Sequence, residues 1–462
     1  MQKVKSIFST KWAKTLCVLA ALYAVAVATY IYIETGKPSG AHDFHAYWYA
    51  GHFVIQRHDP YAAFYAGEQP ELPIKYLDGV IVDHYPVAQT SLEAAPTNTP
   101  LMVLLLTPFS FFSWNVAKHL FVVINLFLML VTGWIVLRLL PFADVKLSPS
   151  NELLLFLAYF DLSATRIAIE NGQTTLSVFL FMLLALLYAK KSWRITGVSL
   201  GIALSKYSLS LPVFLFFVYK RKLKIVLLAI TVQILGVLAL ATIAKTSPFA
   251  IVTENVRLFF DILNQPGVFV NLSSILNAVT QNSFLAQISV FVMSAFVFVL
   301  FFLWLRGRKL KNVSDEVMDF HILTILFLWT ILVGYHRIYD TLILIFFFVL
   351  AFKGLAYPNI WKLNTSERIL LMVFIAVTPL IMILPDRLVD KVIPSYYGTI
   401  STVVSSALFI AMLIVSMLLT RRYMQNRRTE IISVPINSFS ALNQSSQSLF
   451  IENKLSEPSK NA

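Results

Sequence analysis

Apolar runs close to the length of a bilayer span recur along this chain, and they constrain its fold more than any other feature. One of them is LCVLAALYAVAVATYIYI at residues 16–33, and comparable runs follow at intervals as far as residue 419. An α-helix needs about 20 apolar residues to cross the hydrocarbon core of a membrane. Because 58% of the 462 residues are hydrophobic and only 13% are charged, the composition excludes a soluble domain of this size. We predict an all-α polytopic membrane protein.

Basic residues between the apolar runs predict how the chain is oriented. Lys3, Lys5, Lys11 and Lys14 place residues 1–14 in the cytoplasm by the positive-inside rule. The same rule accounts for the net charge of +13, so no nucleic acid partner is predicted. Spans are expected at about 15–33, 115–138, 152–168, 173–189, 223–244, 285–305, 319–335, 338–353, 367–385 and 399–419.

Together with one irregular segment, these spans give about twelve transmembrane helices with both termini in the cytoplasm. The membrane domain would cover residues 15–420. Its first outer loop, 34–113, would carry short helices, and a second outer loop would follow at 245–284. The tail at 421–462 is rich in Ser and Asn, and we expect it to be cytoplasmic and disordered.

The irregular segment is residues 195–219, which lies between the basic stretches KKSWR and KRKLK. Since both flanks should be cytoplasmic, one ordinary span cannot connect them. We predict two short helices that meet at SKYS, residues 205–208, and hold Lys206 at depth near the outer side. Irregular backbone is tolerated there only where it is buried in protein or lines a wet cavity. The alternative is a lysine that extends its ammonium group to the membrane surface.

Polar and charged side chains gather near the predicted outer ends of the spans. Such groups are costly at membrane depth, so they indicate a functional site. They are His42, Asp43, His45, His52, His58, Asp59, Arg166, Glu170, Asn171, Gln173, Lys206, Asn271, His336 and Arg337.

Asp43 lies in the stretch AHDFHAYWYAGHFVIQRHDPY, where a helix would place it on one face with Tyr47 and Ala50. Asp43 could act chemically, or it could be an N-cap whose oxygen accepts backbone N–H groups. Asp59 before Pro60 favours a turn. The histidines suggest a metal site, but their spacing fits no recognised ligand set and their aromatic neighbours favour an interfacial belt, so no metal is predicted.

Two further motifs lie at predicted outer turns. In ATRIAIENGQTTL, residues 164–176, Asn-Gly favours a tight turn between helices, and Arg166 and Glu170 could pair at i, i+4. In GYHRIYDTLIL, residues 334–344, His336 and Arg337 could serve the site, or they could cap a helical hairpin and face water.

Taken together, these motifs resemble glycosyltransferase family 87. The similarity rests on Asp43-x3-Tyr47-x2-Ala50 running to Asp59-Pro60-Tyr61, and on the stretches TPLMVLLLTPFSFF, ENGQTTL, GVSLGIALSKYSLSLP, NLSSILNAV and YHRIYDTLIL. Their order and spacing carry the resemblance over about residues 15–420. Two positions differ from the family pattern. Thr99-Pro100 stands where a double proline is common, and SKYSLSLP is looser than the usual lysine-proline pairing.

The resemblance implies a GT-C type fold and a polyprenyl-phosphate-dependent glycosyltransferase of the bacterial inner (plasma) membrane. Such an enzyme would transfer a glycosyl unit, commonly mannose in this family, to a lipid or glycan acceptor hydroxyl on the outer face. By implication Asp43 is the general base of an inverting transfer, and Lys206, His336 and Arg337 bind the departing phosphate. Substrate-binding residues would be Tyr47, Trp48, Tyr61, Arg166, Glu170, Asn171, Gln173 and Asn271. Because the lipid phosphate is already an activated leaving group, no metal or other cofactor is expected.

Two other functions remain open from the sequence. A transporter or lipid-linked-glycan flippase would suit twelve spans and a broken helix, although no clear internal repeat is visible. A polymerase or ligase that uses polyprenyl-diphosphate glycans would share the same lipid and the same side of the membrane.

Overall fold

A computed structural model describes residues 10–36, 40–68, 95–140, 149–161, 163–263, 282–306, 315–333, 338–356, 363–383 and 397–432, with positions 272, 276, 280 and 361. Within these residues, all regular structure is helical, as predicted.

The N-terminal part forms α1 (Thr10–Gly36), α2 (His42–Ile55), α3 (Pro60–Ala66), α5 (Pro100–Leu106), η3 (Thr107–Phe111), α6 (Trp114–Leu139), α7 (Pro149–Asp161), α8 (Ser163–Glu170) and α9 (Thr175–Tyr188). The remainder forms α10 (Trp193–Ala203), η5 (Leu204–Lys206), α11 (Tyr207–Tyr219), α12 (Leu223–Ala244), α13 (Pro248–Leu263), α15 (Ser283–Arg306), α16 (Asp315–Val333), η6 (Ile338–Leu344), α17 (Ile345–Ala356), α19 (Thr365–Ile383) and α21 (Tyr397–Ile432).

Long apolar helices make this an integral membrane protein. By length and composition, five stretches of the described residues could cross a bilayer: Trp114–Leu139, Trp193–Tyr219, Leu223–Ala244, Glu316–Val333 and Ser406–Met424. Two of these stretches expose large apolar side chains such as Phe127 and Leu227, which suit contact with lipid. The number of about twelve crossings stays a prediction.

The irregular segment at 195–219 folds back on itself, as its basic flanks predicted. Lys190, after α9, and Lys220, after α11, both form ion pairs on the first turns of α16, with Glu316 (2.6 Å) and Asp319 (2.8 Å). The segment therefore begins and ends at the same end of the molecule, although its length and composition alone would allow a single crossing. Lys206 interrupts the helix with φ −121° and ψ 79°, which lies outside the helical region.

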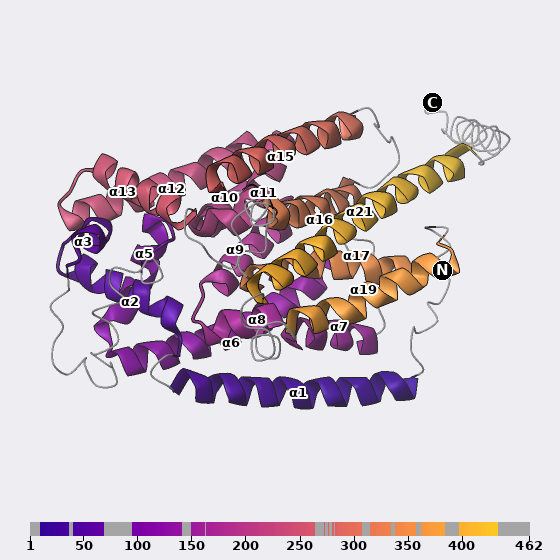
Figure 1. Cartoon of the computed structure of the whole chain (residues 1–462), viewed down its shortest axis with the longest axis horizontal. Helices are drawn as coiled ribbons and strands as arrows, with labels where there is room; N and C mark the ends of the chain where they lie inside the picture. The colour runs from indigo at the N-terminus through magenta and orange to yellow at the C-terminus, as the bar shows by residue number, and fades with distance from the viewer. Residues whose placement is uncertain are drawn as a thin grey trace, which may run out of the picture.

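The molecule thus has two ends of different character. We call the end that holds residues 189–194 and 220–225 the basic end. At the other end, which we call the site end, the short helices α2, α3 and α5 lie together with α13 (Figure 1). The segment 100–113 forms α5 and η3, two short elements rather than a span, as expected for this part of the first outer loop.

Close packing holds α2 against η3. A Cβ atom on Gly51 would lie 2.1 Å from the hydroxyl of Ser110, so only glycine fits at this position. The same Ser110 hydroxyl donates a 2.7 Å hydrogen bond to the carbonyl of Trp48. These two short elements are therefore packed tightly against each other.

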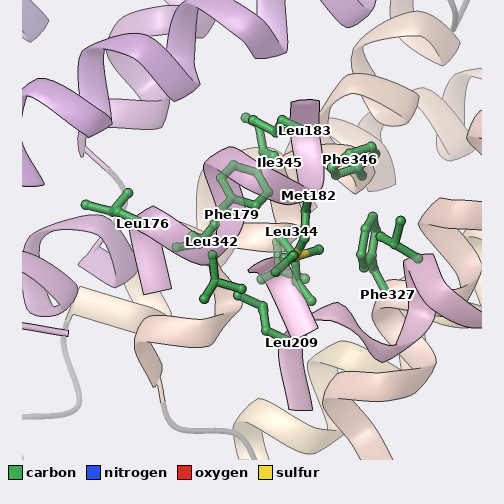
Figure 2. Close-up of a cluster of buried hydrophobic side chains, with 14 of the residues drawn as sticks. Leu176, Phe179, Met182, Leu183, Leu209, Phe327, Leu342, Leu344, Ile345 and Phe346 are labelled. Atoms are coloured by element: carbon green, nitrogen blue, oxygen red, sulfur yellow. The ribbon is translucent and has the colours of Figure 1, made fainter. Parts of the chain in front are cut away.

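Beneath the site end lies a cluster of buried apolar side chains from α9, α11, α16, η6 and α17 (Figure 2). It includes Leu176, Phe179, Met182, Leu183, Leu209, Phe327, Leu342, Leu344, Ile345 and Phe346, all nearly or fully inaccessible to solvent. Burying each such side chain stabilises the fold by roughly 1.5–3 kcal/mol. This cluster fixes the start of α9, the start of α11 and η6 relative to one another.

Three helices differ from their predicted bounds. The span expected at 152–168 consists of two helices, α7 and α8, and the span expected at 338–353 begins with the 3-10 helix η6. The last helix, α21, continues to Ile432, past the expected end of the membrane domain at residue 420.

Candidate active site

The first turn of α2 is held by backbone groups of a distant turn. Ala41, not Asp43, is the N-cap residue, with φ 55° and no side-chain hydrogen bond to the helix. The amide of Ala41 donates to the carbonyl of Glu170 (3.1 Å), and that of Asp43 donates to the carbonyl of Asn171 (3.0 Å). The alternative that Asp43 caps the helix is therefore wrong, because the turn between α8 and α9 supplies the acceptors.

The carboxylate of Asp43 faces the start of α9. Its Oδ2 accepts a hydrogen bond from the side-chain amide of Gln173, and the residue is only 8% exposed. An amide donor at this oxygen holds the carboxylate in one orientation. Gln173, expected from the resemblance to bind substrate, is thus in direct contact with the expected base.

The turn itself requires glycine. Gly172 has φ +69°, a conformation that side chains with a Cβ rarely adopt, and an added Cβ would lie 2.7 Å from that of Phe44. On the preceding helix, Arg166 and Glu170 form the predicted i, i+4 ion pair at 3.7 Å, with each side chain 20% exposed. Asn171 takes part through its carbonyl, and both charged side chains remain partly accessible beside Asp43.

The aromatic residues of α2 and α3 support the site through buried hydrogen bonds. The hydroxyl of Tyr47 lies 3.3 Å from that of Thr97. The indole of Trp48 donates to the carbonyl of Phe112 at 3.0 Å, and the hydroxyl of Tyr61 donates to the carbonyl of Asn98 at 3.0 Å.

Trp48 and Tyr61 are fully buried, so in this structure they pack beneath the site and do not line it. Asp59, expected in a turn, caps α3 instead. Its carboxylate accepts from the amides of Tyr61 and Ala62, with Pro60 at the first helical position.

The histidines of α2 belong to an aromatic cluster. His45 lies against Trp114 and His52 against Trp48, with ring centroids 4.9 and 4.5 Å apart. Burial lowers the pKa of His45 to about 3, with a further contribution from repulsion by His52, and burial lowers the pKa of His52 to about 4. Both rings are therefore neutral at physiological pH. Among the described residues, no group of three or more His, Cys, Asp or Glu side chains could hold a metal ion.

Lys206 is part of a buried polar network. Its ammonium group lies 2.5 Å from Oδ1 of Asp340 and 2.7 Å from the hydroxyl of Thr175, and it sits 4.6 Å from the ring centre of Tyr339. The side chain of Lys206 is 11% exposed and that of Asp340 only 1%. The positive charge expected at residue 206 is thus present, but the carboxylate of Asp340 neutralises it.

Asn98 joins three elements at the site end: the start of α9, α3 and α13. Its amide donates to the hydroxyl of Thr174 at 2.8 Å, and its carbonyl accepts from Tyr61 and from Asn255 of α13 at 3.2 Å. The backbone amide of the next residue, Thr99, donates to the carbonyl of Ser205 in η5. Ser205 lies at the tip of the hairpin that α10 and α11 form.

The start of α9 connects these parts. Three consecutive residues, Gln173, Thr174 and Thr175, contact Asp43, Asn98 and the Lys206–Asp340 pair respectively. Asp43 and Lys206 are therefore each hydrogen-bonded to a side chain of the same three-residue stretch. The arrangement can hold a proton acceptor beside a site for an anion.

Sequence reasoning missed Asp340, Thr175 and Asn98. Asp340 stands in the very stretch that was singled out for His336 and Arg337, and a carboxylate within an apolar run was the available signal. Three predicted site residues, Asn271, His336 and Arg337, lie outside the described residues.

A model of glycosyltransferase family 87 matches residues 97–333, half of the chain, which includes Asn98, Gln173 and Lys206. A comparison with curated protein sequences gives no match.

Similar solved structures include ArnT from Cupriavidus metallidurans in the apo state, at 10% identity and a TM-score of 0.31, covering 87% of this chain and 77% of that one. ArnT bound to undecaprenyl phosphate is 12% identical, with a TM-score of 0.34, covering 91% of this chain and 79% of that one.

The Lys206–Asp340 pair gives a first prediction. Asp340→Asn should lower the free energy of unfolding by about 3–5 kcal/mol, because it leaves a buried ammonium without its counter-charge. The double substitution Lys206→Met with Asp340→Leu should recover most of that loss. Unfolding in detergent measures both. In the control, Asp319→Asn breaks the more exposed pair with Lys220 and should cost about 1 kcal/mol or less. Equal losses in Asp340→Asn and Asp319→Asn would contradict the desolvation argument.

The histidines give a second prediction. Unfolded His45 and His52 take up protons below pH 6.5, whereas the folded rings do so only near pH 3 and 4. Their contribution is therefore complete above pH 6.5 and falls as the pH drops, by about 1.4 kcal/mol per pH unit for His45. Unfolding between pH 7.5 and 5 should show a shallower pH dependence in His45→Phe and in His52→Phe. His58→Gln, at an exposed position, controls for the loss of a histidine side chain.

Proposed function

The chain belongs to glycosyltransferase family 87, and from that premise we propose that it transfers a glycosyl unit from a polyprenyl-phosphate-linked donor to an acceptor hydroxyl, with inversion. The reaction would take place at the site end, in a GT-C type fold, on the outer face of the membrane. The acceptor would be a lipid or a glycan, and mannose is the sugar that the family resemblance suggests.

One observation carries this proposal: the start of α9 joins Asp43 to Lys206. Gln173 contacts the carboxylate and Thr175 the ammonium, and only Thr174 lies between them in the chain. An inverting transfer from a sugar phosphate needs a base near the acceptor and positive charge near the leaving oxygen. The shared attachment of both groups to this stretch supports the proposal that they act on one sugar-phosphate bond. The family match begins at residue 97, so Asp43 precedes it in the chain. The contacts of Asp43 with Asn171 and Gln173 pack α2 against residues inside the match.

Asp43 would accept the proton of the acceptor hydroxyl as that oxygen attacks the anomeric carbon. The bond from this carbon to the phosphate oxygen breaks, and the phosphate leaves with the electron pair. The hydrogen bond from Gln173 to Oδ2 would hold the carboxylate in position for this proton transfer. Backbone carbonyls of the turn satisfy the start of α2, so the carboxylate is not engaged in capping.

The departing phosphate would be bound from the Lys206 side. An ammonium group has three N–H donors, and Asp340 and Thr175 accept two of them, so one remains for a phosphate oxygen. Because Asp340 neutralises the charge of Lys206, a second cation is required. Arg337 and His336 directly precede η6, which carries Asp340, and we assign them this role. The N-terminus of α9 adds the positive end of a helix dipole.

The sugar hydroxyls would be bound by the polar groups around the turn, namely Glu170, Arg166 and Asn171, with Asn271 from the second outer loop. Tyr47 would support Asp43 from the same helix face. No metal or other cofactor enters this mechanism, because the departing lipid phosphate is already an activated leaving group.

The base assignment gives a third prediction. Asp43→Asn should lower the rate of sugar transfer by about 10²–10⁴-fold, because the amide cannot accept the proton. Donor binding and stability should change little. The measurement is transfer from a synthetic polyprenyl-phosphate sugar, followed by mass spectrometry. Asp59→Asn is the matched control, since asparagine caps a helix as well as aspartate does. Full transfer by Asp43→Asn would exclude Asp43 as the base.

Gln173 gives a fourth prediction. If it positions Asp43, Gln173→Ala should lower kcat by about 10-fold or more with little change in KM, because the carboxylate would lose the hydrogen bond that fixes its orientation. A rise in KM for the donor with kcat unchanged would instead assign Gln173 to sugar binding.

The substrate itself can be identified in cells. Mass spectrometry of lipid-linked and surface glycans in a deletion strain reports the sugar and the acceptor together. A parallel assay with monophosphate and diphosphate lipid donors tests the donor class, and transfer from the diphosphate alone would exclude the mechanism above.

A further inference from the structure

The basic end carries a cleft that the proposed reaction does not use. It has a volume of about 770 Å³ and is lined by residues 189–194 and 221–225. Five of its cations are Lys191, Arg194, Arg221, Lys222 and Lys224, and among the described residues none of those lining the cleft is acidic. Positive charge is therefore concentrated in the cleft and is not merely spread over this end of the molecule.

An apolar cavity of about 160 Å³ adjoins this cleft. Its walls come from the ends of α6, α9 and α11 and the starts of α16 and α17, and they include Leu139, Leu186, Phe216, Phe217, Leu323 and Phe346. An engineered apolar cavity of about 150 Å³ is large enough to bind benzene. A second small apolar space, lined by Val136, Ile345 and Val349, extends from the same walls.

The cavity and the cleft share their border. Ala189, Lys190 and Lys222 line both, and the ion pairs of Lys190 with Glu316 and of Lys220 with Asp319 stand at the mouth of the cavity. Leu323 lies about 10 Å beyond Glu316 along α16, at 1.5 Å per residue. The lining thus changes from the cations of the cleft to the apolar side chains of the cavity within about 10 Å. A lipid headgroup and the start of its acyl chains are separated by a similar distance.

From this juxtaposition we propose that the basic end binds one anionic phospholipid of the surrounding bilayer. Its phosphate would lie in the cleft against Arg221, Lys222 and Lys224, and one acyl chain would enter the apolar cavity. Basic pockets between membrane helices are known to bind anionic lipid headgroups. The charge favours an anionic headgroup, and the adjoining cavity favours an amphiphile over a free anion. This site is independent of the glycosyl transfer proposed above.

The test is native mass spectrometry of the full chain, titrated with phosphatidylglycerol or phosphatidylcholine of the same chains. Phosphatidylglycerol should bind at least about 10-fold more tightly. Lys222→Gln should weaken it about 3–10-fold, and Leu323→Phe, which fills the cavity, should weaken it as well. Arg421→Gln is the matched control, because Arg421 is exposed and follows Thr420, which bonds to His321 of α16 near the same end. That variant should bind like the wild type.

Several results would overturn the proposal. Equal weakening by Lys222→Gln and Arg421→Gln would mean diffuse charge attraction. Unchanged binding in Leu323→Phe would place the acyl chains outside the cavity. If Leu323→Phe fails to fold, Lys222→Gln still tests the headgroup site, because the Lys222 side chain is exposed. Competition by glycerol phosphate or inorganic phosphate would identify a free-anion site. Tighter, Lys222-dependent binding of polyprenyl phosphate would identify the carrier lipid as the occupant.

Discussion

The site depends on how the first turn of α2 satisfies its backbone. A helix begins with N–H groups that have no partner within the helix, and Ala41 has no side chain that could accept them. The carbonyls of Glu170 and Asn171 supply two acceptors from a turn about 130 residues later in the chain. These bonds fix α2 on the membrane helices. They also leave the Asp43 side chain for chemistry, since a carboxylate engaged in capping would be a weaker base.

Glycine at position 172 makes that contact possible. Its positive φ closes the turn, and its missing Cβ lets Phe44 approach, so the carbonyls reach the start of α2. The next residues then point their side chains in turn at Asp43, at Asn98 and at Lys206. Residues 173–175 therefore set the relative positions of α2, the segment at Asn98 and Lys206. A hydrogen bond from the amide of Thr99 to the carbonyl of Ser205 also connects the last two directly. A small shift of this turn would displace the carboxylate and the cation together.

The sequence predicted the elements better than it predicted the contacts between them. Span-length runs identified α6 and α12 to within a residue or two, and paired basic flanks identified the hairpin with Lys206 at its tip, because hydropathy and charge act locally. The partner of Lys206 was not predictable in the same way. Asp340 is 134 residues away, and nothing in local propensity distinguishes it from the neighbouring His336 and Arg337. Likewise, whether Asp43 caps α2 or is available as a base depended on the turn between α8 and α9. Only the fold brings that turn close to the start of α2.

The pairing of Lys206 with Asp340 changes what an anion site here requires. A lone ammonium at this depth would be costly, so the carboxylate is the condition under which a lysine can be buried at the hairpin tip. The same pairing removes its net charge, and a phosphate leaving group cannot be stabilised by a neutral pair alone. In the proposed mechanism, the missing positive charge would come from a side chain that is near Asp340 in the sequence. In the sequence, Arg337 stands three residues before it, at the entrance to η6. The 3-10 helix would then serve two purposes. Asp340 would make Lys206 tolerable in the apolar interior, and the residues just before it would restore the charge that Asp340 removes.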